Sequence, residues 1–235
     1  MKNCFKYILI LAGIFAFASC DKKDNYAPPG TYLTGSLMYQ GDSIQVERNQ
    51  VPYQLYQYGF GKVAPIGGSF AQDGSYSQVL FNGDYKLIIP NGQGPFVGKQ
   101  DASGNPDSLS IALNGNQTVD LEVTPYYMIR NAQISAGGGT VTATFKIEKI
   151  ITDPAMAKDI ERVSLYINKA QFVSGGDNIA YKDMAGSDIT DPNNVTLSVN
   201  IPDIVPTQSY VYARVGIKIK DVEDMIFSPL QKVSF

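Results

Sequence analysis

The residue with the most defined chemistry is Cys20, which stands at the end of an apolar segment and is followed at once by charged residues. Two small residues, Ala18 and Ser19, come directly before it, after Phe17. This order is typical of a lipobox, in which a diacylglyceryl group alkylates the cysteine thiol and the chain is cut before the cysteine. The sequence therefore predicts lipidation of Cys20. A cysteine that ends an ordinary signal peptide by chance is the alternative.

The segment before Cys20 has the plan of a bacterial export signal, with Lys2 and Lys6 ahead of an apolar run over residues 7–18. Twelve helical residues reach only about 18 Å, short of the ~30 Å hydrocarbon core of a bilayer. We therefore expect residues 1–19 to be a cleaved lipoprotein signal peptide rather than a membrane span. Residues 20–30 are charged and then rich in proline and glycine, which predicts a solvated, lipidated linker.

Aromatic side chains are the candidates for ligand binding, because a flat ring can stack on the C–H face of a sugar. They crowd one predicted strand and its exit, and they recur at a predicted domain seam. The candidates are Tyr53, Tyr56, Tyr58, Phe60, Tyr126 and Tyr127. Strand alternation predicts that Tyr53 and Leu55 point inward and that Tyr56 and Tyr58 stay exposed. The alternative is ordinary tyrosine packing under a loop or between domains.

Four oxygen-bearing side chains at alternate positions form a calcium candidate: Asp101, Ser103, Asn105 and Asp107. Hard cations such as Ca²⁺ take oxygen ligands from short loops. However, Pro106 and Ala112 stand where an EF-hand loop requires a glycine and a bidentate acid. The alternative is a solvated, turn-rich loop, and we expect no metal and no other cofactor.

Composition excludes several kinds of chemistry. The chain contains no histidine and no tryptophan, which removes Ser-His-Asp and Cys-His catalysis and His-ligated zinc. The acidic groups at 153–161 and 221–224 are interpreted as exposed turn charges, so we expect a non-enzyme. After cleavage, 17 basic residues face 22 acidic ones, which argues against a nucleic-acid partner. Cys4 leaves with the leader, so no disulfide is expected.

Short alternating runs with turn signals between them predict an all-β chain of two antiparallel β-sandwiches in tandem. Residues 31–125 form the first, with strands at 31–39, 51–58, 76–81, 85–89, 109–113 and 118–123. Residues 126–235 form the second, with strands at 140–147, 162–173, 195–201, 210–220 and 226–235. One or two helical turns are expected over 154–160, with Asp153 as the N-cap and Pro154 at the first helical position.

The first domain resembles the carboxypeptidase-regulatory, transthyretin-like sandwich. Three of its motifs are present: Gly35, Asp73-Gly74-Ser75-Tyr76 and Gly83-Asp84-Tyr85. The order of leader, such a domain and an immunoglobulin-like sandwich resembles a two-domain lipoprotein family of Bacteroidetes whose genes often lie beside SusC/SusD-type glycan-uptake pairs. The charged stretch after Cys20 resembles the surface-export signals of Bacteroidetes lipoproteins.

This resemblance implies a protein anchored in the outer membrane by lipid, facing the cell exterior, with a glycan and a SusC/SusD-type transport pair as partners. A periplasm-facing position remains open. The leading hypothesis is therefore a non-catalytic accessory of glycan uptake that binds carbohydrate. The alternative is a structural, adhesive or pilus-like envelope subunit that exchanges a terminal strand such as residues 226–235. An enzyme would need two carboxylates about 5–10 Å apart in a cleft.

Overall fold

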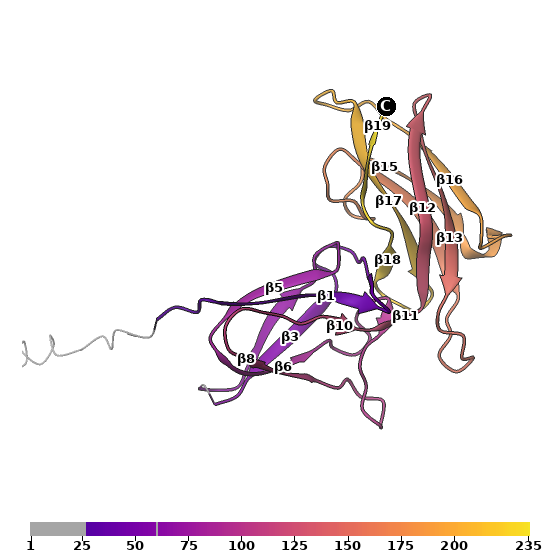
Figure 1. Ribbon diagram of the computed structural model, residues 1–235. Helices are drawn as coiled ribbons and strands as arrows, with labels where there is room; N and C mark the ends of the chain where they lie inside the picture. Colours follow the sequence, from indigo (N-terminus) through magenta and orange to yellow (C-terminus); the bar gives the residue numbers. More distant parts are fainter. Residues whose placement is uncertain (1–26, 60) are drawn as a thin grey trace, which may run out of the picture.

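The computed structural model describes residues 27–59 and 61–235, and it is built almost entirely of β-strands (Figure 1). Within this described part of the chain there is no α-helix, and the single helical element is a short 3-10 turn, η1 (Gly186–Asp188). None of the described residues forms a helix with the length and apolar character needed to cross a membrane. The prediction of an all-β fold with two tandem sandwich domains is confirmed.

The first domain contains an antiparallel sheet that positions the candidate tyrosines. Its strands are β4 (Pro65–Ser69), β3 (Pro52–Gln57), β6 (Gly83–Ile88) and β8 (Leu109–Leu113), in that spatial order. Alternate side chains of β3, β6 and β8 enter the core, among them Leu55, Leu87 and Ile111. The intervening residues of each strand therefore face outward on one open surface.

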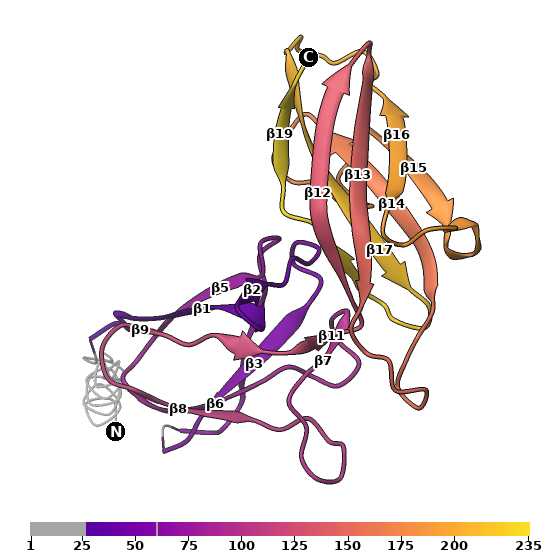
Figure 2. The ribbon, with the colours of Figure 1, turned by 45° about the vertical axis from the view of Figure 1, so that its right-hand side comes forward.

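The second sheet of this domain is organised around β1 (Thr31–Tyr39). Strands β5 (Ser75–Leu80) and β2 (Asp42–Ser43) pair with β1 antiparallel, and β9 (Gln117–Thr118) and β10 (Leu121–Glu122) pair with it parallel. A small ladder of β7 (Phe96–Val97) and β11 (Thr124–Pro125) lies at the end of the domain, beside the second domain (Figure 2).

The motif residues of the transthyretin-like pattern have physical reasons in this sheet. A Cβ at Gly35 would lie 1.9 Å from the carbonyl oxygen of Val119. Only glycine therefore fits at this position of β1, where the backbone between β9 and β10 approaches it most closely. The Tyr76 hydroxyl donates a hydrogen bond to the same oxygen at 2.8 Å. At the turn before β5, Asp73 Oδ1 accepts hydrogen bonds from the backbone N–H and the hydroxyl of Ser75.

The second domain packs a three-stranded sheet against a larger one. The smaller sheet has the order β12 (Tyr127–Gly137), β13 (Thr140–Lys149), β16 (Val195–Asn200). The larger sheet has β15 (Ala180–Ala185), β14 (Ile160–Asn168) and β17 (Tyr210–Ile219) in that order. Two short strands, β18 (Met225–Phe227) and β19 (Gln231–Ser234), both pair with β17.

The two domains make a specific contact centred on Arg214 of β17. This side chain is fully buried, and its guanidinium donates hydrogen bonds to the carbonyl oxygens of Val46 at 2.7 Å and Gln72 at 3.2 Å, both in the first domain. It also lies 3.7 Å from the ring centroid of Phe227. The backbone N–H of Phe227 donates to the Gln45 carbonyl, which adds a β-bridge between the domains.

Of the one or two helical turns expected over 154–160, the structure has a single hydrogen-bonded turn with Asp153 at its start, and no helix forms. The carbonyl oxygen of Asp153 accepts from the N–H groups of Met156 and Ala157, and its Oδ1 accepts from Ala155 N–H, but the chain leaves this single turn and enters β14 at Ile160. Most of this segment is exposed. A short segment that buries little has no packing to offset the cost of nucleating a helix.

The expected closing strand over 226–235 is two strands, because Ser228, Pro229 and Leu230 interrupt it between β18 and β19. Six strands were not expected at all. Three of them have five or more residues, namely β4, β12 and β15, and three have only two residues, namely β2, β7 and β11. Strand β4 contains two consecutive glycines, Gly67 and Gly68, in its interior.

Candidate functional site

The structure divides the candidate aromatic residues among three environments. Tyr53 is 1% exposed and Tyr127 is also buried, so both belong to the core and leave the set of ligand candidates. Tyr56 is half-buried and Tyr58 is 55% exposed, on the outer side of the β3 sheet, as the alternation predicts. Tyr126 is half-buried where the domains meet. Phe60 and Cys20 lie outside the described residues.

The buried tyrosines are held by hydrogen bonds inside the molecule. Tyr53 accepts a hydrogen bond from Gln78 Nε2 at 2.8 Å, and Tyr127 donates to the Lys158 carbonyl at 2.7 Å. Burial raises the pKa of both phenols. These side chains therefore act in packing rather than in binding.

Tyr56 and Tyr58 share the open side of their sheet with polar residues from β6 and β8, and we call this surface the tyrosine face. Its residues are Tyr56, Tyr58, Asp84, Lys86 and Ser110. Pairing between strands places Tyr56 opposite Lys86, and Lys86 opposite Ser110. The face therefore collects residues from three strands that are far apart in the sequence.

The tyrosine face contains a shallow hollow of about 380 Å³, lined by Tyr58, Asp84, Lys86, Ser110 and Ala112, with buried Tyr85 and Ile111 beneath. The Lys86 ammonium lies 5.9 Å from the Tyr58 ring centroid. One exposed ring with a carboxylate, an ammonium and a hydroxyl around it provides both a stacking surface and hydrogen-bonding groups. This combination suits a ligand with an apolar face and hydroxyl groups on its edge.

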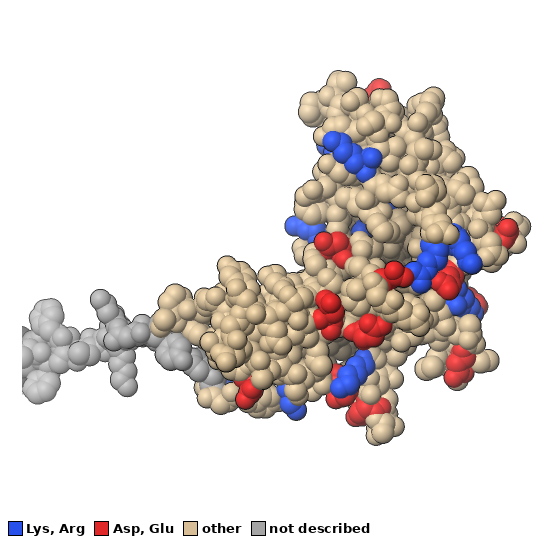
Figure 3. All heavy atoms as spheres, in the orientation of Figure 1, with Lys and Arg blue, Asp and Glu red and all other residues tan. Residues whose placement is uncertain are grey.

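A second hollow of about 180 Å³, the junction groove, lies between the domains. Its polar lining residues are Asn91, Gln93, Gln100, Lys99, Tyr126, Lys158 and Asp221. The first four come from the loop region 91–100 of the first domain, and the last two come from the second domain. Figure 3 shows basic and acidic side chains interspersed around the region where the domains meet, with fewer charges on the far part of the second domain.

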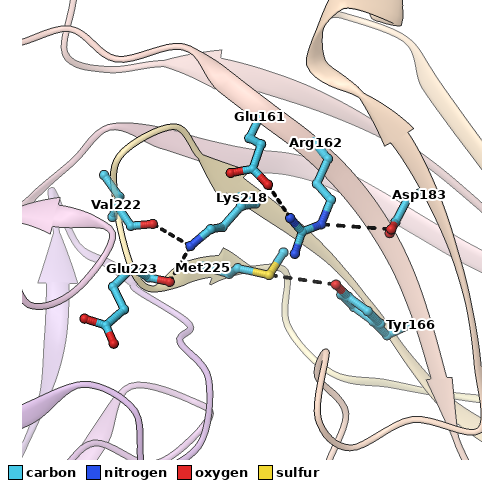
Figure 4. A network of polar contacts seen from close by, with 8 residues as sticks. All are labelled: Glu161, Arg162, Tyr166, Asp183, Lys218, Val222, Glu223 and Met225. Carbon is cyan, nitrogen blue, oxygen red and sulfur yellow. Dashed lines mark hydrogen bonds and ion pairs between the residues drawn. The ribbon is translucent and has the colours of Figure 1, made fainter.

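The junction groove has a defined framework. The buried carboxylate of Asp224 accepts a hydrogen bond from Gly94 N–H at 2.7 Å, which ties the two walls together. Burial raises the pKa of Asp224. The turn that carries Asp224 is held in place because the Lys218 ammonium donates to the carbonyls of Val222 and Glu223, each at 2.5 Å (Figure 4).

The loop with the calcium candidates has its own internal partners. Asp101 Oδ1 accepts from the backbone N–H groups of Ser103 and Asn105, and Asp107 pairs with Lys99 at 2.6 Å. These hydrogen bonds lower the pKa of the Asp101 and Asp107 carboxyls. Over residues 27–59 and 61–235, no group of three or more His, Cys, Asp or Glu side chains has a geometry that could hold a metal ion.

The sequence pointed to Tyr56 and Tyr58 but not to their polar neighbours. Lys86 points outward along the expected strand 85–89, which was a usable signal, whereas Asp84 was placed in the turn before it. Their meeting with β3 and with Ser110 depends on strand pairing, which the local pattern does not encode. The amides of the junction groove carried no signal in the sequence.

Comparisons with known proteins give one consistent family. A model described as "Protein of unknown function (DUF3823) N-terminal domain" matches residues 31–124, and one described as "Domain of unknown function (DUF3823_C)" matches residues 127–232. A search of the curated proteins found no match.

Several solved structures are similar over most of the chain. A DUF3823 family protein from Parabacteroides merdae is 34% identical, with 88% of this chain and 100% of that chain covered and a TM-score of 0.76. One from Bacteroides ovatus is 30% identical, with 87% and 98% covered and a TM-score of 0.74. A protein from Bacteroides uniformis, suggested to be carbohydrate binding, is 15% identical, with 88% and 100% covered and a TM-score of 0.64, which shows a shared fold alone.

Proposed function

The chain belongs to the DUF3823 family, and from this premise we propose that it is a non-catalytic, lipid-anchored surface protein that binds glycan as an accessory of a SusC/SusD-type uptake system. The lipid anchor rests on the sequence around Cys20, and the transporter partner rests on the resemblance of the domain order to Bacteroidetes lipoproteins of glycan-uptake loci. The Bacteroides uniformis protein with the same fold, suggested to be carbohydrate binding, supports the ligand class.

The tyrosine face is the observation that carries the glycan part. The Tyr58 ring is more than half exposed, in a hollow that also contains Asp84, Lys86 and Ser110. An exposed aromatic ring in a hollow with a few convergent polar groups has the composition of a ligand site, and stacking on a sugar would use the ring. In this proposal Tyr58 stacks on a sugar ring while the polar residues bond its hydroxyls.

A glycan array tests this proposal with a soluble protein that begins at Ala27 and keeps both domains. The wild type should bind at least one polysaccharide, and Tyr58→Ala should weaken that binding about tenfold or more, since an aromatic pair contributes ~0.5–1.5 kcal/mol beyond area burial. Tyr32→Ala is the matched control, because Tyr32 is 50% exposed on the other sheet of the same domain. If the wild type binds nothing on a broad array, or if Tyr58→Ala and Tyr32→Ala lose binding equally, the proposal that the tyrosine face binds glycan is rejected.

The anchor and the partner need separate experiments. Metabolic labelling with an alkyne-bearing palmitate should mark the wild-type protein in its native host and leave Cys20→Ala unmarked. Crosslinking on intact cells followed by affinity purification should recover a SusC/SusD-type pair. Recovery of no transporter component would contradict the accessory role without affecting the glycan result.

The alternative of a pilus-like or adhesive subunit depended on exchange of a terminal strand. In the structure β18 and β19 both pair with β17 of the same chain. The C-terminal segment therefore completes its own sheet, and this pairing favours the glycan-binding proposal over strand exchange.

A further inference from the structure

The junction groove combines unengaged polar groups from one loop region with groups from the second domain. No hydrogen bond within the described chain engages the side-chain amides of Asn91, Gln93 and Gln100, or the hydroxyl of Tyr126. All four side chains line the same hollow. Asn91 and Gln100 are exposed and Gln93 and Tyr126 are half-buried, so a ligand in the hollow can reach all four. A few polar groups that converge on one concave surface are typical of a ligand site.

Lys158 and Tyr126 give the groove one cationic and one aromatic wall. The Lys158 ammonium donates to the Asp221 carbonyl at 3.2 Å and lies 6.0 Å from the Tyr126 ring centroid. An ammonium has three donors, so Lys158 keeps donors for a ligand. A phenol is protonated at neutral pH because its ordinary pKa is about 10, and burial raises the pKa of Tyr126 further, so its hydroxyl can donate.

The charges of the groove balance and favour a neutral ligand. The lining contains one cation, Lys158, and one anion, Asp221, and its other cation, Lys99, is already paired with Asp107 at 2.6 Å. The remaining polar groups are amides, which both donate and accept. Sugar hydroxyls also donate and accept hydrogen bonds, so they match these amides. A charged ligand would instead require a groove with an excess of the opposite charge.

The size of the groove limits what it can hold. Its volume of about 180 Å³ is below the range of ~300–1,000 Å³ typical of pockets for drug-sized ligands. A single sugar ring is a better match than an oligosaccharide. The framework is fixed from both sides by the Asp224–Gly94 hydrogen bond, so the site exists only when the two domains are joined.

We propose that the junction groove is a second carbohydrate site, which binds one neutral sugar residue at the end of a glycan with Tyr126, Gln93 and Lys158 as its main contacts. The proposal shares only the ligand class with the proposed function, because its residues are separate from the tyrosine face. The first site holds a glycan on an open sheet, and the second has room for a single residue, which is why a chain end is assigned to it.

Chemical-shift titration of the isotope-labelled protein beginning at Ala27 tests this proposal. The probes are the methyl glycosides of glucose, galactose, mannose, xylose and N-acetylglucosamine, with glucuronate as the charged comparison. At least one neutral glycoside should shift the backbone amides of residues 91–100, 126, 158 and 221–222 at millimolar concentration. Absence of such shifts with every probe, or tighter binding of glucuronate than of each neutral glycoside, would overturn the proposal.

Variants separate this site from the tyrosine face. Each of the variants Gln93→Ala, Tyr126→Phe and Lys158→Met should raise the Kd for the glycoside about tenfold, which corresponds to ~1.4 kcal/mol. Gln133→Ala and Lys182→Met, at exposed positions of the second domain, are matched controls and should bind as the wild type does. Tyr58→Ala should also leave the groove intact. Loss in Tyr58→Ala alone, with the groove variants unchanged, would reject the groove and retain the proposed function.

Discussion

At the scale of single residues, burial decides what each tyrosine can do. The alternation along β3 placed Tyr53 and Leu55 inside and Tyr58 outside, and this could be predicted because side-chain period in a strand is a local property. The neighbours Asp84, Lys86 and Ser110 could not be predicted, since they reach Tyr58 through pairing between separate strands. The residues of the tyrosine face were therefore only partly visible in the sequence.

The buried phenols predict a loss of stability at alkaline pH. Burial raises the pKa values of Tyr53, Tyr76, Tyr85 and Tyr127 above the usual value of about 10. Above about pH 10 the unfolded chain loses these protons while the folded chain keeps them. The native state then binds more protons than the unfolded state, so the free energy of unfolding falls as the pH rises. The stability that these phenols contribute is fully present below about pH 10.

Urea unfolding between about pH 8 and about pH 11 measures this loss. Burial lowers the pKa of Arg214 to about 9, so this residue makes the free energy of unfolding rise with pH and opposes the effect of the tyrosines. The informative comparison is therefore between the wild type and tyrosine variants. Tyr85→Phe should reduce the alkaline slope, whereas Tyr32→Phe, at an exposed position, should leave it unchanged. Identical slopes in the wild type and in Tyr85→Phe would contradict the assignment.

At the scale of elements, the strands that the sequence missed have physical explanations. The alternation of β12 is broken by a register shift between Arg130 and Gln133, where Asn131 has a positive φ of 53°. Strand β15 is a mostly exposed sheet edge, so it lacks an apolar pattern. In β4, Gly68 is required because a Cβ there would lie 2.3 Å from the ring of Tyr53. Glycine is depleted in strands, so a strand that needs glycine to make room for a packed ring lacks a strand pattern in the sequence.

The backbone at Val119, between β9 and β10, lies so close to β1 that position 35 requires glycine. Gly35→Ala should lower the free energy of unfolding by about 2 kcal/mol or more, since the new Cβ collides with a backbone carbonyl. Gly67→Ala is the control, because nothing lies within 4 Å of a Cβ at that position in β4. It should change stability by less than about 1 kcal/mol in urea unfolding. Equal effects of the two substitutions would refute the role given to Gly35.

At the scale of the whole molecule, the junction makes two sandwiches into one unit. The motifs of the first domain and the strand spacing predicted the two sandwiches, but no sequence feature predicted that Arg214 would enter the first domain. Arg214 alternates with the buried Ala213 and Val215, so its side chain points away from the core of its own domain, toward the place where the other domain packs. Contacts between domains are long-range, and a local pattern cannot distinguish an interface from solvent.

Arg214→Met should uncouple the domains. It leaves the carbonyls of Val46 and Gln72 without their donors, and each unsatisfied buried group costs about 1–3 kcal/mol. Urea or thermal unfolding should show a loss of about 2 kcal/mol or more and a separation of one transition into two. Arg162→Met removes only partly exposed ion pairs with Glu161 and Asp183, and should cost less than about 1 kcal/mol. A single transition at the wild-type midpoint in Arg214→Met would contradict this coupling.

The most direct test of the central claim maps a bound glycan onto the protein by nuclear magnetic resonance. The polysaccharide that binds best on the array is cut to oligosaccharides and titrated into the protein beginning at Ala27. The account predicts the largest amide shifts at Tyr56, Tyr58, Asp84, Lys86 and Ser110, on the outer side of the β3–β6–β8 sheet. Saturable binding whose shifts fall on other surfaces and leave these amides unmoved would contradict it.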